Sequence, residues 1–479
     1  MIAASIHPEI LCRSLILPTS TIASTFLVFT ISLRPQQPKI SNMANKLSRI
    51  PFLFILLFTF LCFLFPSLPS NTDKVQYNTT DMAWMLTATA MVLIMTPGLA
   101  FFYGGMVNKK NVISTMLQSF ICMAVVTVIW FVFGFGLVFG DSVAGIIGNP
   151  SSFFMMNGIL DAKPWELAPT IPLALFAMYQ LKFAIITPAL VTGAFAERIR
   201  FISYVFFICL FFIFIYAPLA HATWHPDGIL FKFGVLDFAG GTVVHMSAGW
   251  AALASAIYLK RRSEPNHNPA RVTYVMLGTG LLWFGWFGFN AGSAFAVGKL
   301  SVIALSTTMA ASAAAALAWI FFDSFKGRKP SAMGTCIGAV VGLVAITPAA
   351  GFVTIPHSLA IGIIASIISN IIVDWRTRTS IDDTLDVFPC HGVGGMVGMI
   401  LTGVFASQAI NPANTTGNGL IFQETKLFVV QSVALVGASI FAFFGSWLLL
   451  KITDMVTPLR VSEEEERLGL DISQHGESL

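Results

Sequence analysis

The chain has 479 residues, of which 56% are hydrophobic and only 10% are charged, and its mean hydropathy is +0.79. Soluble globular proteins carry about a quarter charged residues, so this composition favours a membrane protein. The net charge of +4 is too small to indicate a nucleic-acid partner. Each of the six cysteines lies alone in an apolar stretch, without a C-x-x-C pair. We therefore predict neither a disulfide framework nor a metal site, and no cofactor.

The first 80 residues are predicted to be an extension outside the functional core. Residues 51–65 form a dense apolar run that follows two basic residues and precedes prolines. This order is typical of a secretory signal peptide, here spanning residues 46–70. An uncleaved membrane anchor is the alternative, because no clear A-x-A cleavage site follows the run. Met43 lies just upstream, so the translation of residues 1–42 and the cleavage of 46–70 both stay open.

Apolar runs of about 20 residues, the length that crosses a hydrocarbon core about 30 Å thick, recur throughout residues 81–457. They predict an all-α membrane protein with eleven transmembrane helices. The predicted spans are 82–105, 113–139, 168–192, 201–221, 238–259, 271–291, 300–323, 332–348, 352–373, 389–406 and 427–453. The short loops leave no room for a soluble catalytic domain, so we predict that the protein is not an enzyme. No G-x-x-x-x-G-K-[ST] nucleotide-binding loop occurs, so we predict no coupling to ATP within this chain.

Basic residues are divided unequally between alternate loops. One set of five loops holds thirteen of them and the other set holds four. The rich set comprises Lys109, Lys110, Arg198, Arg200, Lys260, Arg261, Arg262, Arg271, Lys326, Arg328, Lys329, Arg376 and Arg378. Since loops rich in Lys and Arg stay in the cytoplasm, we predict a multi-pass protein of the cell membrane with its N-terminus outside and its C-terminus inside. Two sequons, at Asn78 and Asn414, fall on the outer face and predict N-glycosylation there.

A short internal echo links two of the predicted spans. A Leu-Asp-Phe triplet at 236–238 opens the fifth span and leads to His245, and a Leu-Asp-Val triplet at 385–387 precedes the tenth span and leads to His391. The two segments enter the membrane from opposite sides. This pattern predicts two inverted repeats of five helices each, followed by a final helix.

The two histidines are candidate functional residues because they are ionisable and lie inside spans. A charge at the bilayer centre costs about 2.5–3.5 kcal/mol, so such residues indicate a function. His245 lies eight residues beyond Asp237, roughly 12 Å along a helix, and His391 lies five residues beyond Asp386, roughly 8 Å. From opposite faces the two can reach a similar depth and form a pair that relays one proton. The alternative is that each is a structural histidine bonded to a neighbouring helix.

Aromatic residues form a second candidate site. Its members are Gln180 and Phe183 in the third span, Trp224 after the fourth, and Trp286, Phe289 and Ser293 near the outer end of the sixth. Aromatic faces with a hydroxyl group suit a small cation, through cation–π attraction and a hydrogen bond. The alternative is an interfacial aromatic belt with ordinary core packing, and spacing alone does not select these residues.

Five stretches of the sequence carry a family resemblance. They are DMAWMLTATAMVLIMTPGLAFFYGG at 81–105, AFAERIRF at 194–201, LDFAGGTVVH at 236–245, GWFGFNAGSA at 285–294 and DVFPCHGVGG at 386–395. With the tail they extend over residues 80–476, and the set resembles the ammonium transporter family (Amt/Mep/Rh), specifically its Amt branch. The resemblance implies a homotrimer of eleven-helix subunits with one ammonium-conducting pore in each.

The resemblance also implies roles for individual residues. The matches are Trp224, Phe183 and Ser293 for the outer ammonium-recruitment site, Asp237 for the acid that supports it, Phe183 and Phe289 for the gate, His245 and His391 for the pore, and Gln180, Trp286 and Thr347 for secondary lining positions. Ammonium would lose water at the aromatic site and a proton near the gate, and ammonia would pass the histidines. Lys182 departs from the family pattern. We expect it to point away from the pore, paired or snorkelling, because adjacent residues do not share a helix face.

Residues 458–479 are predicted to be a cytoplasmic regulatory tail. The stretch RVSEEEERLGLDISQHGE, residues 460–477, resembles the family's tail, which docks on neighbouring subunits and is a possible site for a cytoplasmic regulator. The alternative is a solvated acidic run. Two other functions stay open: a sensor that signals through this tail, and a gas channel of the Rh type. An intramembrane hydrolase lacks a nucleophile and a metal set, and whether transport is electrogenic is not decided by the sequence.

Overall fold

The computed structural model describes residues 50–66, 69, 76–265 and 268–479, and the chain divides after Phe65 into two units that are described separately. In the first unit, helix α2 (Ile50–Leu64) coincides with the apolar run predicted at 51–65. Its large apolar side chains, such as Phe63, are exposed. An apolar helix suits a signal peptide and a membrane anchor alike, so the cleavage of residues 46–70 stays a prediction. Residues 1–42 lie outside the described residues.

The second unit is built mainly of helices. Its α-helices are α3 (Thr79–Leu93), α4 (Met95–Met106), α5 (Val112–Ile129), α6 (Phe135–Phe139), α7 (Leu173–Phe195), α8 (Phe201–Phe211), α9 (Ala217–Trp224), α10 (Ile229–Phe233), α11 (Ser247–Leu259), α12 (Val272–Ala291), α13 (Lys299–Phe325), α14 (Ala332–Ile346), α15 (Ile355–Thr377), α16 (Gly394–Phe405), α17 (Lys426–Val456) and α18 (Glu463–Leu468). Its π-helical segments are η2 (Trp130–Gly134), η4 (Phe212–Tyr216), η5 (Gly241–Met246), η7 (Phe388–Val393) and η9 (Asp471–His475). Its 3-10 segments are η1 (Lys109–Asn111), η3 (Phe154–Met156), η6 (Gly292–Ala294) and η8 (Leu420–Phe422). Strands β1 (Ser142–Val143) and β2 (Ile147–Gly148) pair antiparallel, with Ser142 opposite Gly148.

Ten helical segments of the described chain are long and apolar enough to cross a membrane. They are Thr79–Met106, Lys109–Phe139, Leu173–Phe195, Phe201–Phe233, Gly241–Leu259, Val272–Ala294, Lys299–Phe325, Ile355–Thr377, Phe388–Phe405 and Lys426–Val456. These segments confirm an all-α, multi-pass membrane protein. The predicted eighth span, 332–348, corresponds to helix α14, which has only 15 residues and ends two residues before Pro348. The count of eleven membrane helices therefore stays a prediction.

Prolines explain two differences between the predicted and the observed spans. The third span was predicted to begin at residue 168, but α7 begins at Leu173, because Pro172 is the N-cap and has an extended backbone. In the first span the helix is interrupted at Ile94, between α3 and α4. Pro97 has no backbone N–H and cannot bond to the carbonyl one turn earlier, so the break falls there.

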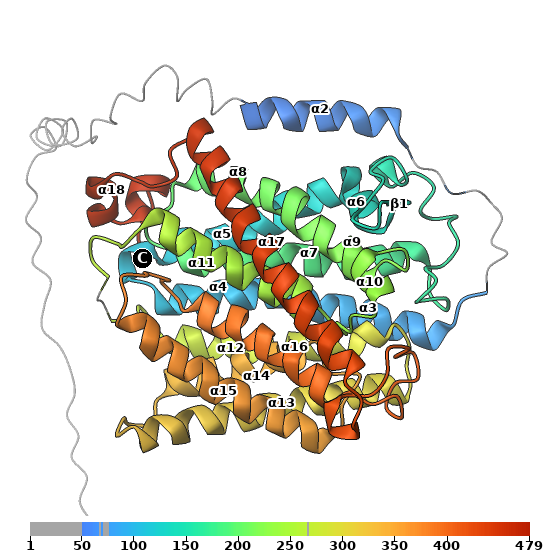
Figure 1. Ribbon diagram of the computed structural model, residues 1–479. Coiled ribbons are helices and arrows are strands. Elements are labelled where there is room, and N and C mark those ends of the chain that lie inside the picture. Colours follow the sequence, from blue (N-terminus) through green and yellow to red (C-terminus); the bar gives the residue numbers. More distant parts are fainter. Residues whose placement is uncertain (1–49, 67–68, 70–75, 266–267) are drawn as a thin grey trace, which may run out of the picture. The chain divides into compact units, whose positions relative to one another are not determined.

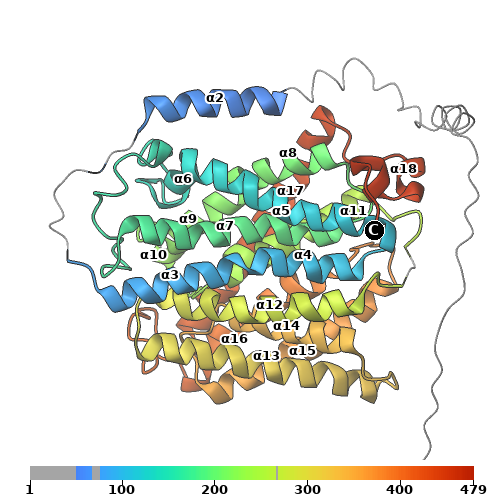
Figure 2. The ribbon, with the colours of Figure 1, turned by 180° about the vertical axis from the view of Figure 1, so that it is seen from behind.

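The helices of the second unit pack in pairs that are distant in sequence. Helix α4 lies alongside α12, and α13 packs against α14 and α15 (Figures 1 and 2). Helix α17, red in Figure 1, runs obliquely across α8, α11 and α16. Large apolar side chains such as Leu317 of α13 and Phe444 of α17 are exposed, as expected where lipid is the solvent.

Loops of the second unit gather at two opposite ends of the helices. Helix α10 and strand β1 lie at one end, which we call the Trp224 end because α9 finishes there at Trp224 (Figure 1). Helix α18 lies at the other, the tail end. The sequence predicts that the Trp224 end is outside the cell and the tail end inside, and this orientation stays a prediction.

The two histidine-bearing segments are antiparallel. Segment η5 leads into α11, and α11 packs against η7; segment η7 leads into α16, and α16 packs against η5. The helix that follows each histidine segment therefore packs against the other histidine segment, so the two chain segments run in opposite directions. This arrangement agrees with the inverted echo in the sequence, while the five-helix repeats as a whole stay a prediction.

Candidate functional site

His245 and His391 lie beside each other, although they are 146 residues apart in sequence. Their Nδ1 atoms are 3.4 Å apart, their ring centroids are 5.4 Å apart, and both side chains are buried. At this distance one ring nitrogen donates a hydrogen bond to the other, with the roles set by the tautomers. Nε2 of His245 has no hydrogen-bond partner among the described residues. The structure thus brings together the two histidines that the sequence nominated and leaves one ring nitrogen available.

Asp237 fixes the segment that carries His245. Its Oδ1 accepts hydrogen bonds from the backbone N–H groups of Gly240 and Gly241, at 2.8 and 2.6 Å. Its Oδ2 accepts from those of Thr242 and Val243, at 2.8 and 3.3 Å. These N–H groups open η5 and have no helical partner of their own, so the buried carboxylate is the acceptor that they need. The position of His245 along its segment therefore depends on Asp237.

A close contact between backbones holds the two histidine segments together. A Cβ atom on Gly249, in α11, would lie 2.2 Å from the Cα of Gly392, which directly follows His391. No side chain fits at that distance, so glycine is required for the approach. Bulk at Gly249 would push η7 and the His391 ring away from His245.

The predicted aromatic residues form a continuous column that ends at the histidines. Phe183 and Phe289 stack with centroids 4.1 Å apart and an angle of 23° between the rings. Phe183 and Trp224 pack edge to face, with ring centroids 5.9 Å apart and an angle of 84° between the ring planes. On the other side Trp286 stacks on His245 at 5.2 Å, and its indole N–H donates to the Thr347 hydroxyl at 2.9 Å.

Ser293 joins this column through a residue that the sequence did not single out. The Tyr179 hydroxyl lies 3.2 Å from the Ser293 hydroxyl and donates to the carbonyl of Phe289 at 2.8 Å. The Tyr179 ring also contacts that of Phe183, with centroids 5.1 Å apart. Tyr179 is one helical turn before Phe183, a spacing that places both on one face and is the signal that was available. Gln180, its neighbour, is buried, with Oε1 unbonded to any described residue.

A narrow cavity lies between Phe289, one member of the stacked pair, and the two histidines. Its lining residues are Met95, Leu99, Phe102, Ile186, Leu190, His245, Leu282, Trp286, Phe289, Val340 and His391. Apart from the imidazole rings and the Trp286 indole, these side chains are apolar. A hydrated ion has no groups there to replace its water, whereas a small neutral solute can form a hydrogen bond with the histidines.

Comparison with known proteins decides the family. Residues 83–479 match the profile of the Ammonium Transporter Family. The chain belongs to this family. The ammonium transporter of Bacillus subtilis is 42% identical over 401 residues, which are 83% of this chain and 97% of that protein. The crystal structure of Candida albicans Mep2 is 35% identical, with a TM-score of 0.77 over 81% of this chain and 88% of that one. A solved structure called Sensor Amt Protein is 30% identical, with a TM-score of 0.75 over 83% of this chain and 98% of that one.

Within this family member, Lys182 lies on α7 directly before the stacked Phe183. Its side chain is buried, at 7% exposure, and it forms no ion pair with the described residues. The expected burial is therefore observed without a carboxylate partner. Lys182 is not among the residues that line the cavity, and its orientation away from the pore stays a prediction. Nothing in the structure explains a lysine at this position.

The two predicted glycosylation sites differ in accessibility. Asn78 is exposed, and its side-chain oxygen caps α3 by accepting from the backbone N–H of Thr80. Asn414 is fully buried, and its amide nitrogen donates to the carbonyl of Gly417 at 2.6 Å. That nitrogen is the atom that would carry a glycan. In the folded chain Asn78 is therefore accessible for glycosylation and Asn414 is not, a difference that the sequons alone do not reveal.

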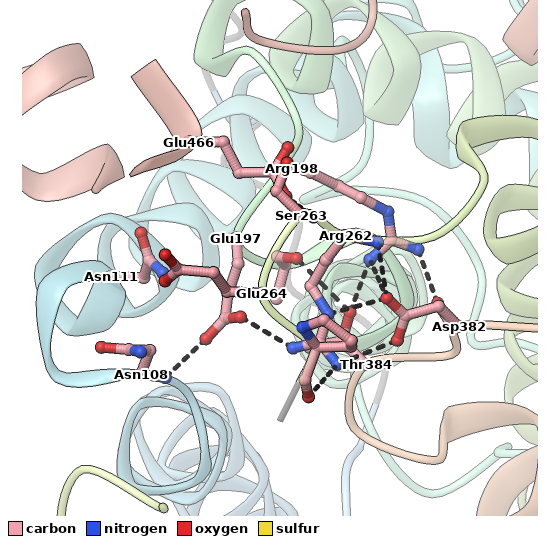
Figure 3. Close-up of polar contacts among 12 residues, drawn as sticks. Asn108, Asn111, Glu197, Arg198, Arg262, Ser263, Glu264, Asp382, Thr384 and Glu466 are labelled. Carbon is pink, nitrogen blue, oxygen red and sulfur yellow. Dashed lines mark hydrogen bonds and ion pairs between the residues drawn. The ribbon is translucent and has the colours of Figure 1, made fainter. Parts of the chain in front are cut away.

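At the tail end, a buried ion cluster joins loops that are far apart in sequence (Figure 3). Arg262 donates two hydrogen bonds of 2.9 Å to Asp382, from Nε and Nη2, and one of 2.7 Å to Glu197 from Nη1. Burial by itself raises the pKa of Asp382, but the hydrogen bonds of Arg262 and the charge of Arg198 lower it from 3.8 to about 2. The ion pair therefore stabilises the fold at neutral pH, and this stabilisation is lost progressively as the pH falls from 3.8 through about 2.

The tail contacts loops of its own chain at this end. Glu466 accepts a hydrogen bond from the backbone N–H of Ser263 at 2.6 Å, and Asp471 accepts from those of Ile113 and Ser114 at 3.1 and 2.8 Å. Asp471 thereby caps the N-terminus of α5, where the helix dipole favours an anion. Because two acidic side chains of the tail accept backbone hydrogen bonds from other parts of the chain, the tail is more than a solvated acidic run. Docking on neighbouring subunits stays a prediction.

Proposed function

We propose that the protein is a transporter or channel for ammonium in the cell membrane and is not an enzyme. The observation that carries this proposal is a narrow, mostly apolar cavity lined by His245 and His391, whose wall includes Phe289, the stacking partner of Phe183. Membership of the ammonium transporter family supports the choice of substrate. A path of this kind admits a small solute that forms hydrogen bonds and excludes hydrated ions.

Ammonium is recruited at the Trp224 end. The faces of Trp224 and Phe183 attract a small cation, and the Ser293 hydroxyl accepts a hydrogen bond from it. The backbone carbonyl of Asp237 accepts the indole N–H of Trp224 at 3.1 Å, so the residue whose carboxylate caps η5 also holds the Trp224 ring in place. The contacts of ammonium with Trp224, Phe183 and Ser293 replace part of the hydration shell that it leaves behind.

Ammonia, rather than ammonium, passes the histidines. A charge in an apolar cavity costs several kcal/mol, and neutral ammonia avoids most of that cost. Ammonium gives up its proton near the Phe183–Phe289 gate, and ammonia then passes His245 and His391, whose neutral rings exchange hydrogen bonds with it. Trp286 lies in the cavity wall, and Gln180 and Thr347 are the secondary positions proposed around this path. Potassium is excluded because it has no proton to release and donates no hydrogen bond.

Current recording in oocytes tests this function directly. Cells that express the protein are expected to take up labelled ammonium and methylammonium and to show no potassium current above that of uninjected cells. A current with ammonium shows that the proton also crosses, and uptake without current shows electroneutral transport of the Rh gas-channel kind. A potassium current comparable to the ammonium current would contradict the proposed selectivity.

Sensing is a second candidate function. It is supported by the likeness to the structure called Sensor Amt Protein and by the contacts of the tail with the tail-end loops. Deletion of residues 461–479 separates the two functions in a cell with a reporter of nitrogen signalling. If the protein is a sensor, the deletion abolishes signalling and leaves ammonium uptake intact. If it is only a transporter, signalling follows uptake in every variant.

The assembly and placement follow from the same family reasoning. We propose a homotrimer in the lipid bilayer of the cell membrane, with the Trp224 end outside, the tail available to a cytoplasmic regulator, and a glycan on Asn78. Neither a cofactor nor a metal has a part in the proposed path. Among the described residues, no group of three His, Cys, Asp or Glu side chains is placed to hold a metal ion.

A further inference from the structure

The start of the His391 segment has its own buried carboxylate. The sequence echo pairs Asp386 with Asp237, but in the structure Asp386 forms an ion pair with Nε of Arg376, at 2.6 Å. The carboxylate that caps η7 belongs to Asp383, whose Oδ2 accepts the backbone N–H of Phe388 at 2.7 Å. Phe388 is the first residue of η7, and Asp383 is fully buried.

We propose that Asp383 is the positioning residue of His391, with the part in η7 that Asp237 has in η5. The inference rests on the proposed function, because the path past the histidines is what the position of His391 controls. Asp383 lies eight residues before His391, as Asp237 lies eight residues before His245. The equal spacing and the shared capping contact identify the pair of corresponding acids more securely than the Leu-Asp triplets.

The first turn of η7 has one backbone donor fewer than an ordinary turn, which makes the cap important. Pro389, the second residue of η7, has no backbone N–H to donate. The next N–H, that of Cys390, donates to the carbonyl of Asp386 at 3.0 Å. The hydrogen bond from Phe388 to Asp383 therefore joins the start of η7 to the preceding loop. Its loss is expected to shift the start of η7, and the ring of His391 with it.

The loop that carries Asp383 is itself anchored on both sides. Arg198 donates to the carbonyl of Asp382 at 2.6 Å and to the hydroxyl of Thr384 at 2.7 Å (Figure 3). The N–H of Leu385 donates to the carbonyl of Gly193 in α7 at 3.1 Å. The loop that carries Asp383 is thus bonded both to Arg198 and to α7, the helix of Phe183 and Ile186. Because this loop is fixed, the hydrogen bond from Phe388 to Asp383 also fixes the start of η7, and breaking that bond uncouples η7 from the loop.

A double-mutant cycle with His391 tests the inference. Asp383→Ala removes the cap, Asp383→Asn keeps an oxygen acceptor for the Phe388 N–H, and Asp386→Asn is a matched control in the same loop. Each is measured in the wild-type and the His391→Ala background, with methylammonium uptake and the ratio of ammonium to potassium current as readouts, normalised to surface protein. If Asp383 acts through His391, Asp383→Ala lowers uptake about tenfold and shifts the current ratio. The factor of about ten is the effect expected from the loss of one buried hydrogen bond.

In the His391→Ala background the same change is expected to alter both readouts less than about twofold, since coupled residues are not additive. Asp383→Asn stays within about threefold of wild type, and Asp386→Asn acts additively with His391→Ala. If Asp383→Ala does not reach the surface, the cycle is run with Asp383→Glu, which displaces the carboxylate by one methylene group. Additive effects of Asp383 and His391 overturn the inference, as do wild-type readouts for Asp383→Ala. Absence of ammonium transport in the wild type would instead overturn the proposed function.

Discussion

Replacing Asp237 by Ala is expected to abolish ammonium uptake, lowering it at least about a hundredfold. The side chain accepts the backbone N–H groups of Gly240, Gly241, Thr242 and Val243, all of them buried. Each buried donor left without an acceptor costs about 1–3 kcal/mol, and 1.4 kcal/mol corresponds to a factor of ten in rate. Uptake of labelled methylammonium by cells that express equal amounts of surface protein measures the effect.

Asp237→Asn is the matched control for this change. The amide keeps one oxygen acceptor for the start of η5 but loses the charge and one acceptor, so its uptake should lie between those of wild type and the Ala variant. If the Ala variant is poorly folded, its melting temperature in detergent falls, whereas that of the Asn variant stays closer to wild type. Wild-type uptake by Asp237→Ala, at equal surface abundance, would contradict the part assigned to this carboxylate.

Replacing His391 by Ala is expected to lower ammonium uptake about tenfold and to raise the potassium current relative to the ammonium current. The change removes one partner of the contact between the two Nδ1 atoms and a hydrogen-bonding group from the cavity wall. A net hydrogen bond contributes about 1–1.5 kcal/mol, which sets the expected factor. The smaller side chain also widens the cavity, so water and a partly hydrated ion can enter. Current recording with ammonium and with potassium in the same oocyte measures the ratio.

His221 is a matched control for this prediction. It is a fully buried histidine with both ring nitrogens bonded, to Ser142 Oγ and to the carbonyl of Val138, each at 2.7 Å. It is not among the residues that line the cavity. His221→Ala should therefore lower stability and surface expression without changing the current ratio. If His391→Ala and His221→Ala shift the ratio equally, His391 has no special part in selection.

The membrane fold could be predicted from the sequence because its main constraint is local. In lipid every backbone polar group must be bonded within its own helix, so each span appears as a continuous apolar run. Boundaries such as Leu173 of α7 depend on single prolines and are also local. Helix α14 is the exception, since its 15 residues are apolar but short, and its place among the spans depends on how its neighbours pack.

The candidate site could be predicted only in part. His245 and His391 were nominated because they are ionisable and lie inside spans, and Phe183 and Phe289 by the family resemblance. That resemblance identifies residues but does not show how the residues are arranged in space. Tyr179 was missed because a tyrosine one turn from a phenylalanine is common in any apolar helix. Its significance comes from a hydrogen bond to the carbonyl of Phe289, 110 residues away. No local pattern reports such a contact.

The sequence by itself determined the lipid solvent, the helical class and the two histidines as candidates, because hydropathy and ionisable groups inside spans are properties of each segment alone. The aromatic residues were selected only by the family resemblance. Only the tertiary structure decided that the two histidines lie 3.4 Å apart, that Asn414 is buried, and that Asp383 rather than Asp386 caps the second segment. These facts depend on which backbone groups from distant segments meet. The Gly249–Gly392 contact and the loop held by Arg198 bring them together.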